Sequence, residues 1–153
     1  MVATGRVGFC IDEPCGRPIA GVLRVLRAPG HQNIADVWDL NLPGVSDEVL
    51  MIELGKLGYA AMVTTDSSIL RAALRRDAWQ HSGLTLFVLD GRWGNLSLFD
   101  RARRLIWWWP DLVAKAGEGP QGAAWRVAPE RSPANMVRIL PKLGPEPEGD
   151  TPA

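Results

Sequence analysis

Short apolar segments with strand character alternate with segments of helical periodicity along this 153-residue chain, and this alternation limits the possible folds more than any other feature. Strands favour β-branched and aromatic residues, whereas amphipathic helices repeat apolar residues three and four positions apart. Strands are expected at 7–11, 34–40, 59–65, 84–89 and 123–127, and helical patterns lie at 18–26, 47–57, 69–74 and 96–109. The pattern predicts an α/β fold with a mainly parallel sheet and helices on both faces.

Local signals predict some element boundaries. Ser46 has the character of a helix N-cap, and Asp47 and Glu48 fill the first turn that follows it. Pro110 is expected to disturb or end the helix that starts near Leu96. Residues 135–140 form a segment too short to assign from sequence.

The composition predicts one domain, over residues 1–140. Single cores typically occupy ~100–200 residues, and 46% hydrophobic with 22% charged residues is a globular balance. Repeated Pro, Gly and Glu over residues 141–153 predict a disordered tail.

Charge and hydropathy limit the partners. Seventeen basic and seventeen acidic residues leave no net charge, so a nucleic acid would have to be held by local patches. No apolar run approaches the ~20 residues that span a bilayer, and the N-terminus lacks an apolar signal segment. We therefore expect a cytoplasmic protein with no membrane contact.

Carboxylates follow the strand-like segments. Asp12, Asp66 and Asp90 each come directly after one, and Asp47 and Glu48 start a helix that follows another. Carboxyl ends of parallel strands meet at one sheet edge, where ligands bind. Clustered carboxylates repel one another unless a cation joins them, and oxygen ligands suit Mg²⁺ or Mn²⁺. Two such ions ~3.5–4 Å apart can cleave a phosphodiester.

Any single aspartate after a strand is more often a turn former or an N-cap, so the metal hypothesis depends on the set. Asp90 is a weaker candidate, and Asp36 and Asp39, inside a predicted strand, are weaker still.

The cysteines and histidines do not form a recognisable site. Cys10 and Cys15 lack a second cysteine pair or a nearby histidine to complete a zinc site, so buried thiols are expected. His31 and His81 stand alone, and a structural or surface role is the simpler interpretation.

Arginines and tryptophans add two hypotheses. Arginines that could border the acids and hold RNA phosphates are Arg71, Arg75, Arg76, Arg92, Arg101, Arg103 and Arg104, although solvated helix faces are the ordinary explanation. Trp107, Trp108 and Trp109 are consecutive, and helical positions differ by ~100°, so at least one is expected to be exposed at a partner interface.

The order of these segments resembles the PIN-like domains of VapC-type toxins, which are ribonucleases of bacterial toxin–antitoxin pairs. The resemblance is carried by the strand ending Cys10-Ile11-Asp12-Glu13, the helix 18–26, the run 46–50 and Val63-Thr64-Thr65-Asp66, and it continues to about Val127. The chain departs from the family at Thr65, because many members have a basic residue there.

The resemblance implies a PIN-like three-layer sandwich, endonucleolytic RNA cleavage with Mg²⁺ or Mn²⁺, and an antitoxin that occludes the site. By position, Asp12 and Asp66 would be the principal metal ligands, Asp47 or Glu48 the third, and Asp90 an uncertain fourth. The sequence leaves open whether the chain also forms a homodimer.

Two other classes compete with this interpretation. One is a PIN-like module that has lost catalysis and only binds protein or RNA. The other is a phosphoacceptor receiver-like domain, which ranks last because no lysine follows a late strand.

Overall fold

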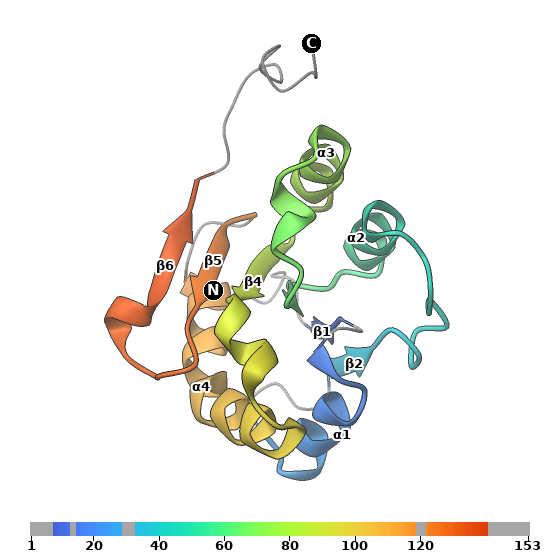
Figure 1. Cartoon of the computed structure of the whole chain (residues 1–153). Helices are drawn as coiled ribbons and strands as arrows, with labels where there is room; N and C mark the ends of the chain where they lie inside the picture. Colours follow the sequence, from blue (N-terminus) through green and yellow to red (C-terminus); the bar gives the residue numbers. More distant parts are fainter. Residues whose placement is uncertain (1–7, 13–14, 29–32, 119–121, 141–153) are drawn as a thin grey trace.

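The computed structural model describes residues 8–12, 15–28, 33–118 and 122–140, and its centre is one six-stranded sheet (Figure 1). The strand order is β2-β1-β3-β4-β5-β6. The first five strands in this order are parallel, and β6 pairs antiparallel with β5. The strands are β1 (Phe9–Ile11), β2 (Ile34–Asp36), β3 (Ala61–Thr64), β4 (Thr85–Leu89), β5 (Ala124–Val127) and β6 (Met136–Ile139). The prediction of a mainly parallel α/β sheet is confirmed.

Two helices cover each face of the sheet, so the fold has three layers (Figure 1). On one face, α1 (Pro18–Val25) and α4 (Leu98–Glu118) pack on strand residues such as Phe87. On the other, α2 (Asp47–Lys56) and α3 (Ala73–Ser82) pack on the alternate residues, such as Leu86. Because both faces are covered, β4 is buried at all five positions, which explains why the four residues after Thr85 are all apolar.

The chain changes direction across the sheet between β1 and β3. From β1 it passes through α1 outward to β2, and from β2 it returns through α2 to β3 on the other side of β1. The loops that follow β1 and β3 therefore lead to helices on opposite faces and leave space between them at the carboxyl edge. This edge is where Asp12 and Asp66 follow their strands.

A glycine allows α2 and α3 to pack closely. A Cβ atom on Gly55 of α2 would lie 3.0 Å from both the Cα and the carbonyl oxygen of Ser82 in α3. Such contacts would push the helices apart, so glycine is needed here despite its cost in a helix interior. The close approach matters for the site, because α3 carries Arg75 to the start of α2.

The structure differs from the sequence-based expectations in several places. The second strand ends at Asp36 and not at Leu40, because Asp36 and Asp39 form a turn closed by reciprocal hydrogen bonds of 2.7 and 3.0 Å. Pro110 does not end α4, which continues to Glu118 because buried Trp108, Trp109 and Leu112 hold it on the sheet. The unassigned segment 135–140 contains β6.

In the described part of the chain, no helix is both long and apolar enough to cross a bilayer. The predicted tail, 141–153, lies outside the described residues, and so do Glu13 and His31.

Candidate functional site

Asp12 lies directly after β1, with only 6% of its surface exposed. Its backbone N–H donates to the Val63 carbonyl of β3 at 2.9 Å, which continues the parallel ladder one residue past the strand. Its carboxylate accepts a hydrogen bond from the Thr64 hydroxyl group at 2.8 Å. The short strand thus delivers a nearly buried carboxylate to the carboxyl edge of the sheet.

Asp66 lies two residues after the end of β3 and caps the following 3₁₀ turn, η3 (Ser67–Leu70). Its Oδ1 accepts hydrogen bonds from both the backbone N–H and the hydroxyl group of Ser68. Its own N–H donates to the Thr64 hydroxyl oxygen at 3.0 Å. The Thr64 hydroxyl group therefore connects the carboxylate of Asp12 to the backbone of Asp66.

Asp47 enters the same region from the first turn of α2. The Ser46 side chain caps this helix by accepting from the Val49 N–H at 3.4 Å, as the sequence predicted. Burial, together with the negative charges of Asp12 and Asp66, raises the pKa of Asp47 to about 6. The three carboxylates are thus close enough to oppose one another's ionisation.

Asp47 and Asp66 share a hydrogen bond and titrate as a pair. Partial burial acts to raise the pKa of Asp66, but hydrogen bonds from Ser68 and Asp47 outweigh it and hold that pKa below its usual range. Asp66 is therefore the more acidic of the two carboxyl groups and is ionised at neutral pH.

Arg75 of α3 lies against the start of α2. Its Nε is 3.3 Å from Glu48 Oε2 and 3.8 Å from Asp47 Oδ2, and its Nη1 donates to the Ser68 hydroxyl oxygen at 2.7 Å. Glu48 is thus on the same side of the helix start as Asp47, but its carboxylate points toward the guanidinium. Among the described contacts, Arg75 is therefore a cation shared by Asp47 and Glu48.

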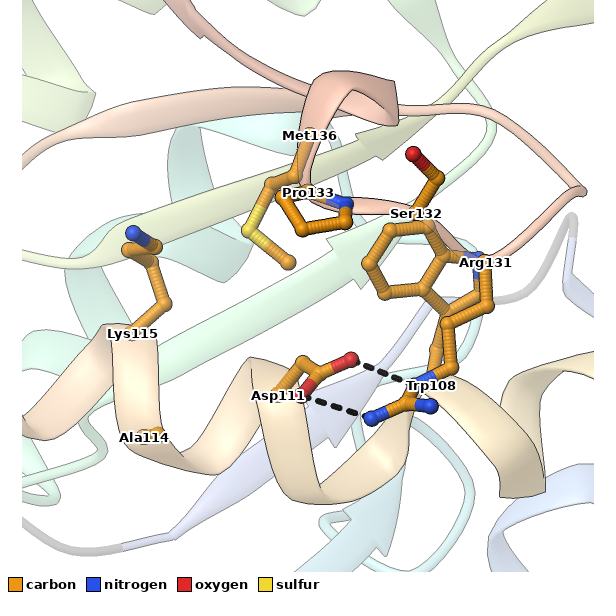
Figure 2. A pocket seen from close by; sticks show the side chains of 8 residues that line it. All are labelled: Trp108, Asp111, Ala114, Lys115, Arg131, Ser132, Pro133 and Met136. Carbon is orange, nitrogen blue, oxygen red and sulfur yellow. Dashed lines mark hydrogen bonds and ion pairs between the residues drawn. The ribbon is translucent and has the colours of Figure 1, made fainter.

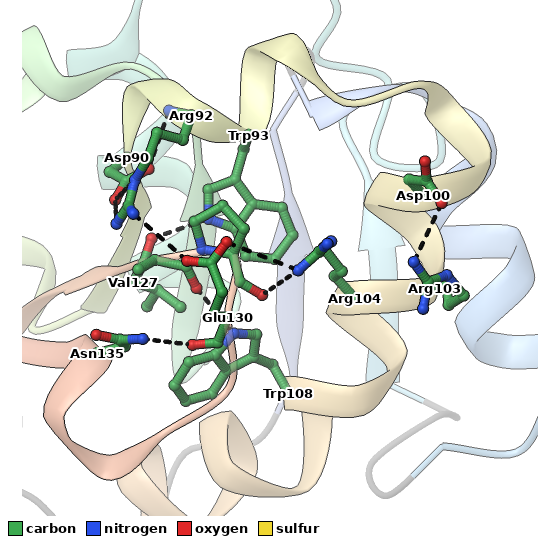
Figure 3. Close-up of polar contacts among 12 residues, drawn as sticks. Asp90, Arg92, Trp93, Asp100, Arg103, Arg104, Trp108, Val127, Glu130 and Asn135 are labelled. Atoms are coloured by element: carbon green, nitrogen blue, oxygen red, sulfur yellow. Dashed lines mark hydrogen bonds and ion pairs between the residues drawn. The ribbon is translucent and has the colours of Figure 1, made fainter.

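Asp90 follows β4 at the same edge, but its carboxylate is engaged elsewhere (Figure 3). It caps the 3₁₀ turn η4 (Gly91–Asn95) by accepting from the Arg92 N–H at 3.0 Å. The Arg92 guanidinium also pairs with Asp90 at 2.8 Å and with Glu130 at 3.4 Å. The structure therefore brings Asp12, Asp47 and Asp66 together, and places Asp90 in a separate ion-pair network.

Asp36 and Asp39 have structural partners at the end of β2. Besides their reciprocal hydrogen bonds, Asp39 pairs with Arg24 of α1 at 3.0 Å. The backbone hydrogen bond from Asp36 and the charge of Arg24 lower the pKa of Asp39, although partial burial acts to raise it. These contacts account for both acids as parts of a turn.

The donor set of the site fits a hard divalent cation in its chemistry. Asp12, Asp47, Glu48 and Asp66 offer only carboxylate oxygens, which are the ligands of Mg²⁺ and Mn²⁺. Among the described residues, no three His, Cys, Asp or Glu side chains are arranged as a ready-made metal-holding group. Asp47 would have to lose its proton and its contact with Arg75 to act as a ligand.

The thiols and the described histidine are not part of this site. Cys10 and Cys15 are buried and free, as predicted, and burial followed by the charge of Asp12 raises the pKa of each thiol well above its usual range. His81 is exposed in the last turn of α3, and its ring nitrogen contacts the Asp77 carbonyl at 3.3 Å.

The tryptophan run divides as its helical spacing predicts. Trp107 is 57% exposed, whereas Trp108 and Trp109 are 1% and 0% exposed. A cavity of about 460 Å³ lies beside Trp108, between α4 and the segment 131–136, and two residues that line it, Asp111 and Arg131, form an ion pair (Figure 2). None of the candidate acids lines it.

Sequence reasoning missed two residues that organise the site. Thr64 was treated as part of a strand, although a hydroxyl residue at the last position of a buried strand next to a candidate aspartate is a usable signal. Arg75 was grouped with the arginines that could hold phosphates, whereas its described partners are carboxylates and Ser68. Its role depends on how closely α3 packs on α2, and no local pattern encodes that.

A family model described as a PIN-like domain matches residues 8–91, more than half of the chain. The matched segment runs from β1 to the residue after Asp90 and includes all five candidate acids. No curated protein and no solved structure matched the chain.

Proposed function

The chain belongs to the PIN-like domain family, a superfamily of nucleases, and from this premise we propose that it is a divalent-metal-dependent ribonuclease. Hydrolysis of a phosphodiester inside an RNA strand is the reaction that agrees best with both the nuclease family and the acidic site. The observation that carries the proposal is the mutual influence of Asp12, Asp47 and Asp66 at the switch point between β1 and β3.

A site kept only for stability would not gather these acids. Burial, together with the charges of Asp12 and Asp66, holds a proton on Asp47 up to about pH 6 that a free carboxyl would release near pH 4, which is a cost to the folded state. Proteins commonly accept such a cost where a group is needed for function. The acids therefore support a cation-dependent activity better than a structural role.

In the proposed mechanism, Asp12 and Asp66 are the principal ligands of Mg²⁺ or Mn²⁺, and Asp47 or Glu48 completes the set. A bound divalent cation lowers the pKa of a coordinated water and stabilises the leaving oxygen. The Thr64 hydroxyl group orients the Asp12 carboxylate, and the Ser68 contacts orient that of Asp66. Near pH 6 and above, Asp47 gives up the proton that competes with the cation.

Arginines next to the acids supply positive charge for an RNA backbone. Arg71 is exposed directly after η3 and contacts Ser67 at 3.2 Å, and Arg76 donates to the Arg71 carbonyl at 2.7 Å. Both follow Asp66 closely in sequence, so a phosphate bound beside the carboxylates would lie near them. We propose that they hold the strand through charge, without reading its sequence.

We further propose that the protein is the toxin of a VapC-type toxin–antitoxin pair. Two exposed apolar features support a protein partner. Trp107 is one, and the other is a groove of about 540 Å³ between α1 and α4 in which Phe99 is 75% exposed. An apolar segment of an antitoxin would bury such surface.

The test of the nuclease proposal is cleavage of a mixed RNA substrate by the full chain with Mn²⁺ and with excess chelator. Cleavage that needs the cation and is lost in Asp66→Asn supports it. If the protein binds RNA but neither binds Mn²⁺ nor cuts, the alternative of a PIN-like binding module replaces the proposal.

A further inference from the structure

Arg75 is linked to three of the four acids of the site. It contacts Glu48 and Asp47 directly, at 3.3 and 3.8 Å, and it reaches Asp66 through Ser68, whose hydroxyl group accepts from Arg75 and donates to Asp66. One guanidinium thus contacts two of these carboxylates directly and a third through one hydroxyl group.

These contacts lie in a partly shielded environment. The side chains of Asp47 and Glu48 are 18% and 20% exposed, and that of Arg75 is 32% exposed. Water therefore screens the ion pairs less than at an open surface. The positive charge of Arg75 also acts to lower the pKa of both Asp47 and Asp66.

A divalent cation and Arg75 would compete for the same oxygens. The Asp47 and Glu48 carboxylates cannot point at the guanidinium and also act freely as metal ligands, and two positive groups at one cluster repel each other.

We propose that Arg75 is the internal counter-ion of the acidic site and that it sets the affinity for the divalent cation by competing with it. This inference rests on the metal site proposed above. In the metal-free protein, Arg75 offsets part of the negative charge of Glu48 and of ionised Asp47, and so keeps the crowded acids compatible with the fold. Loading of the site requires the guanidinium to leave these carboxylates.

The experiment measures Mn²⁺ affinity of the full-length protein by titration calorimetry. Arg75→Gln and Arg75→Met both remove the charge, and Met keeps the apolar stem if Gln disturbs packing. Both variants should bind Mn²⁺ roughly three- to tenfold more tightly than the wild type. The reason is that they lose the partly exposed ion pairs of Arg75 with Asp47 and Glu48, which compete with the cation. Arg75→Lys should restore affinity toward that of the wild type.

Melting temperature without and with metal is the second measurement. The neutral variants should melt lower than the wild type without Mn²⁺, because the acids lose their counter-ion. Saturating Mn²⁺ should close that difference. A purely structural arginine would leave a deficit that metal does not remove, and that result would overturn the inference.

Arg71→Gln is the matched control. It removes the same charge four positions before Arg75, and among the described hydrogen bonds the Arg71 side chain contacts only Ser67. Its Mn²⁺ affinity should change by less than about twofold. An equal gain in Arg71→Gln, or no gain in either neutral Arg75 variant, would refute direct competition. If either of these outcomes is found while the wild type binds Mn²⁺ and Asp66→Asn does not, the metal site stands and only the role of Arg75 is refuted. If the wild type binds no Mn²⁺, the metal site and this inference both fail.

Discussion

The Thr64 hydroxyl group donates a hydrogen bond to Asp12 Oδ2 at 2.8 Å, across 52 positions of the sequence. The same oxygen accepts from the Asp66 N–H, so one buried side chain fixes the two acids that flank the switch point of the sheet. The precision of the site thus depends on a residue that would not itself bind metal or substrate.

Thr64→Val should reduce both stability and activity. The substitution keeps the β-branched shape but leaves the nearly buried Asp12 carboxylate without this donor, which should lower the free energy of unfolding by about 1–3 kcal/mol. Thr64→Ser retains the hydroxyl group and should keep most of the metal-dependent activity. Urea denaturation and RNA cleavage measure the two effects, and equal cleavage by the Val and Ser variants would contradict the positioning role.

Asp47 should make the protein less stable as the pH rises from about 4 to about 6. Its pKa is raised from 3.8 to about 6 on folding, so between these values the folded state binds more protons than the unfolded state, and the free energy of unfolding falls with pH. Asp66 acts oppositely: its lowered pKa contributes stability above pH 3.8 that is lost in stronger acid.

Asp47→Asn should remove this pH dependence, since its amide can donate to Asp66 as the protonated acid does. Relative to the wild type, the variant should be similar near pH 4 and more stable at pH 7, by about 1 kcal/mol after allowance for solvent screening. Thermal melts in metal-free buffer across this range provide the measurement. A stability difference that is constant with pH would show that the acids do not interact as described.

Asp90→Asn should have a smaller effect on cleavage than Asp12→Asn. The Asp90 carboxylate caps η4 and pairs with Arg92, so its loss should weaken that turn by roughly 1 kcal/mol while the amide retains part of the cap. Parallel kinetic measurements on the two variants separate the roles. Loss of cleavage as complete in Asp90→Asn as in Asp12→Asn would make Asp90 a necessary member of the site.

Much of the fold could be predicted from local pattern because both faces of the sheet are covered. Burial on both sides makes four consecutive residues of β4 apolar, and the cap at Ser46 predicts the start of α2. The errors came where tertiary contacts outweigh local preference. Buried Trp108 and Trp109 carry α4 through Pro110, and the Asp36–Asp39 hydrogen bonds end β2 early.

The site was predictable to the level of its acids but not of their partners. Parallel topology brings the residues after β1 and β3 to one edge, which is why Asp12 and Asp66 could be paired from the sequence. Whether a carboxylate at that edge faces the site depends on side-chain geometry. Asp90 has the same kind of position as Asp12 but turns to Arg92, and no periodicity distinguishes the two.

Cation-dependent RNA cleavage by matched aspartate variants tests the central claim most directly. Asp12→Asn and Asp66→Asn each remove a charged ligand while keeping volume, and Asn can still accept from Thr64 or cap η3. With Mn²⁺ at pH 7, the wild type should cut RNA and lose activity in excess chelator, and both variants should stay folded with cleavage reduced by at least about a hundredfold. Undiminished cleavage by both folded variants, or by the wild type in excess chelator, would contradict the account.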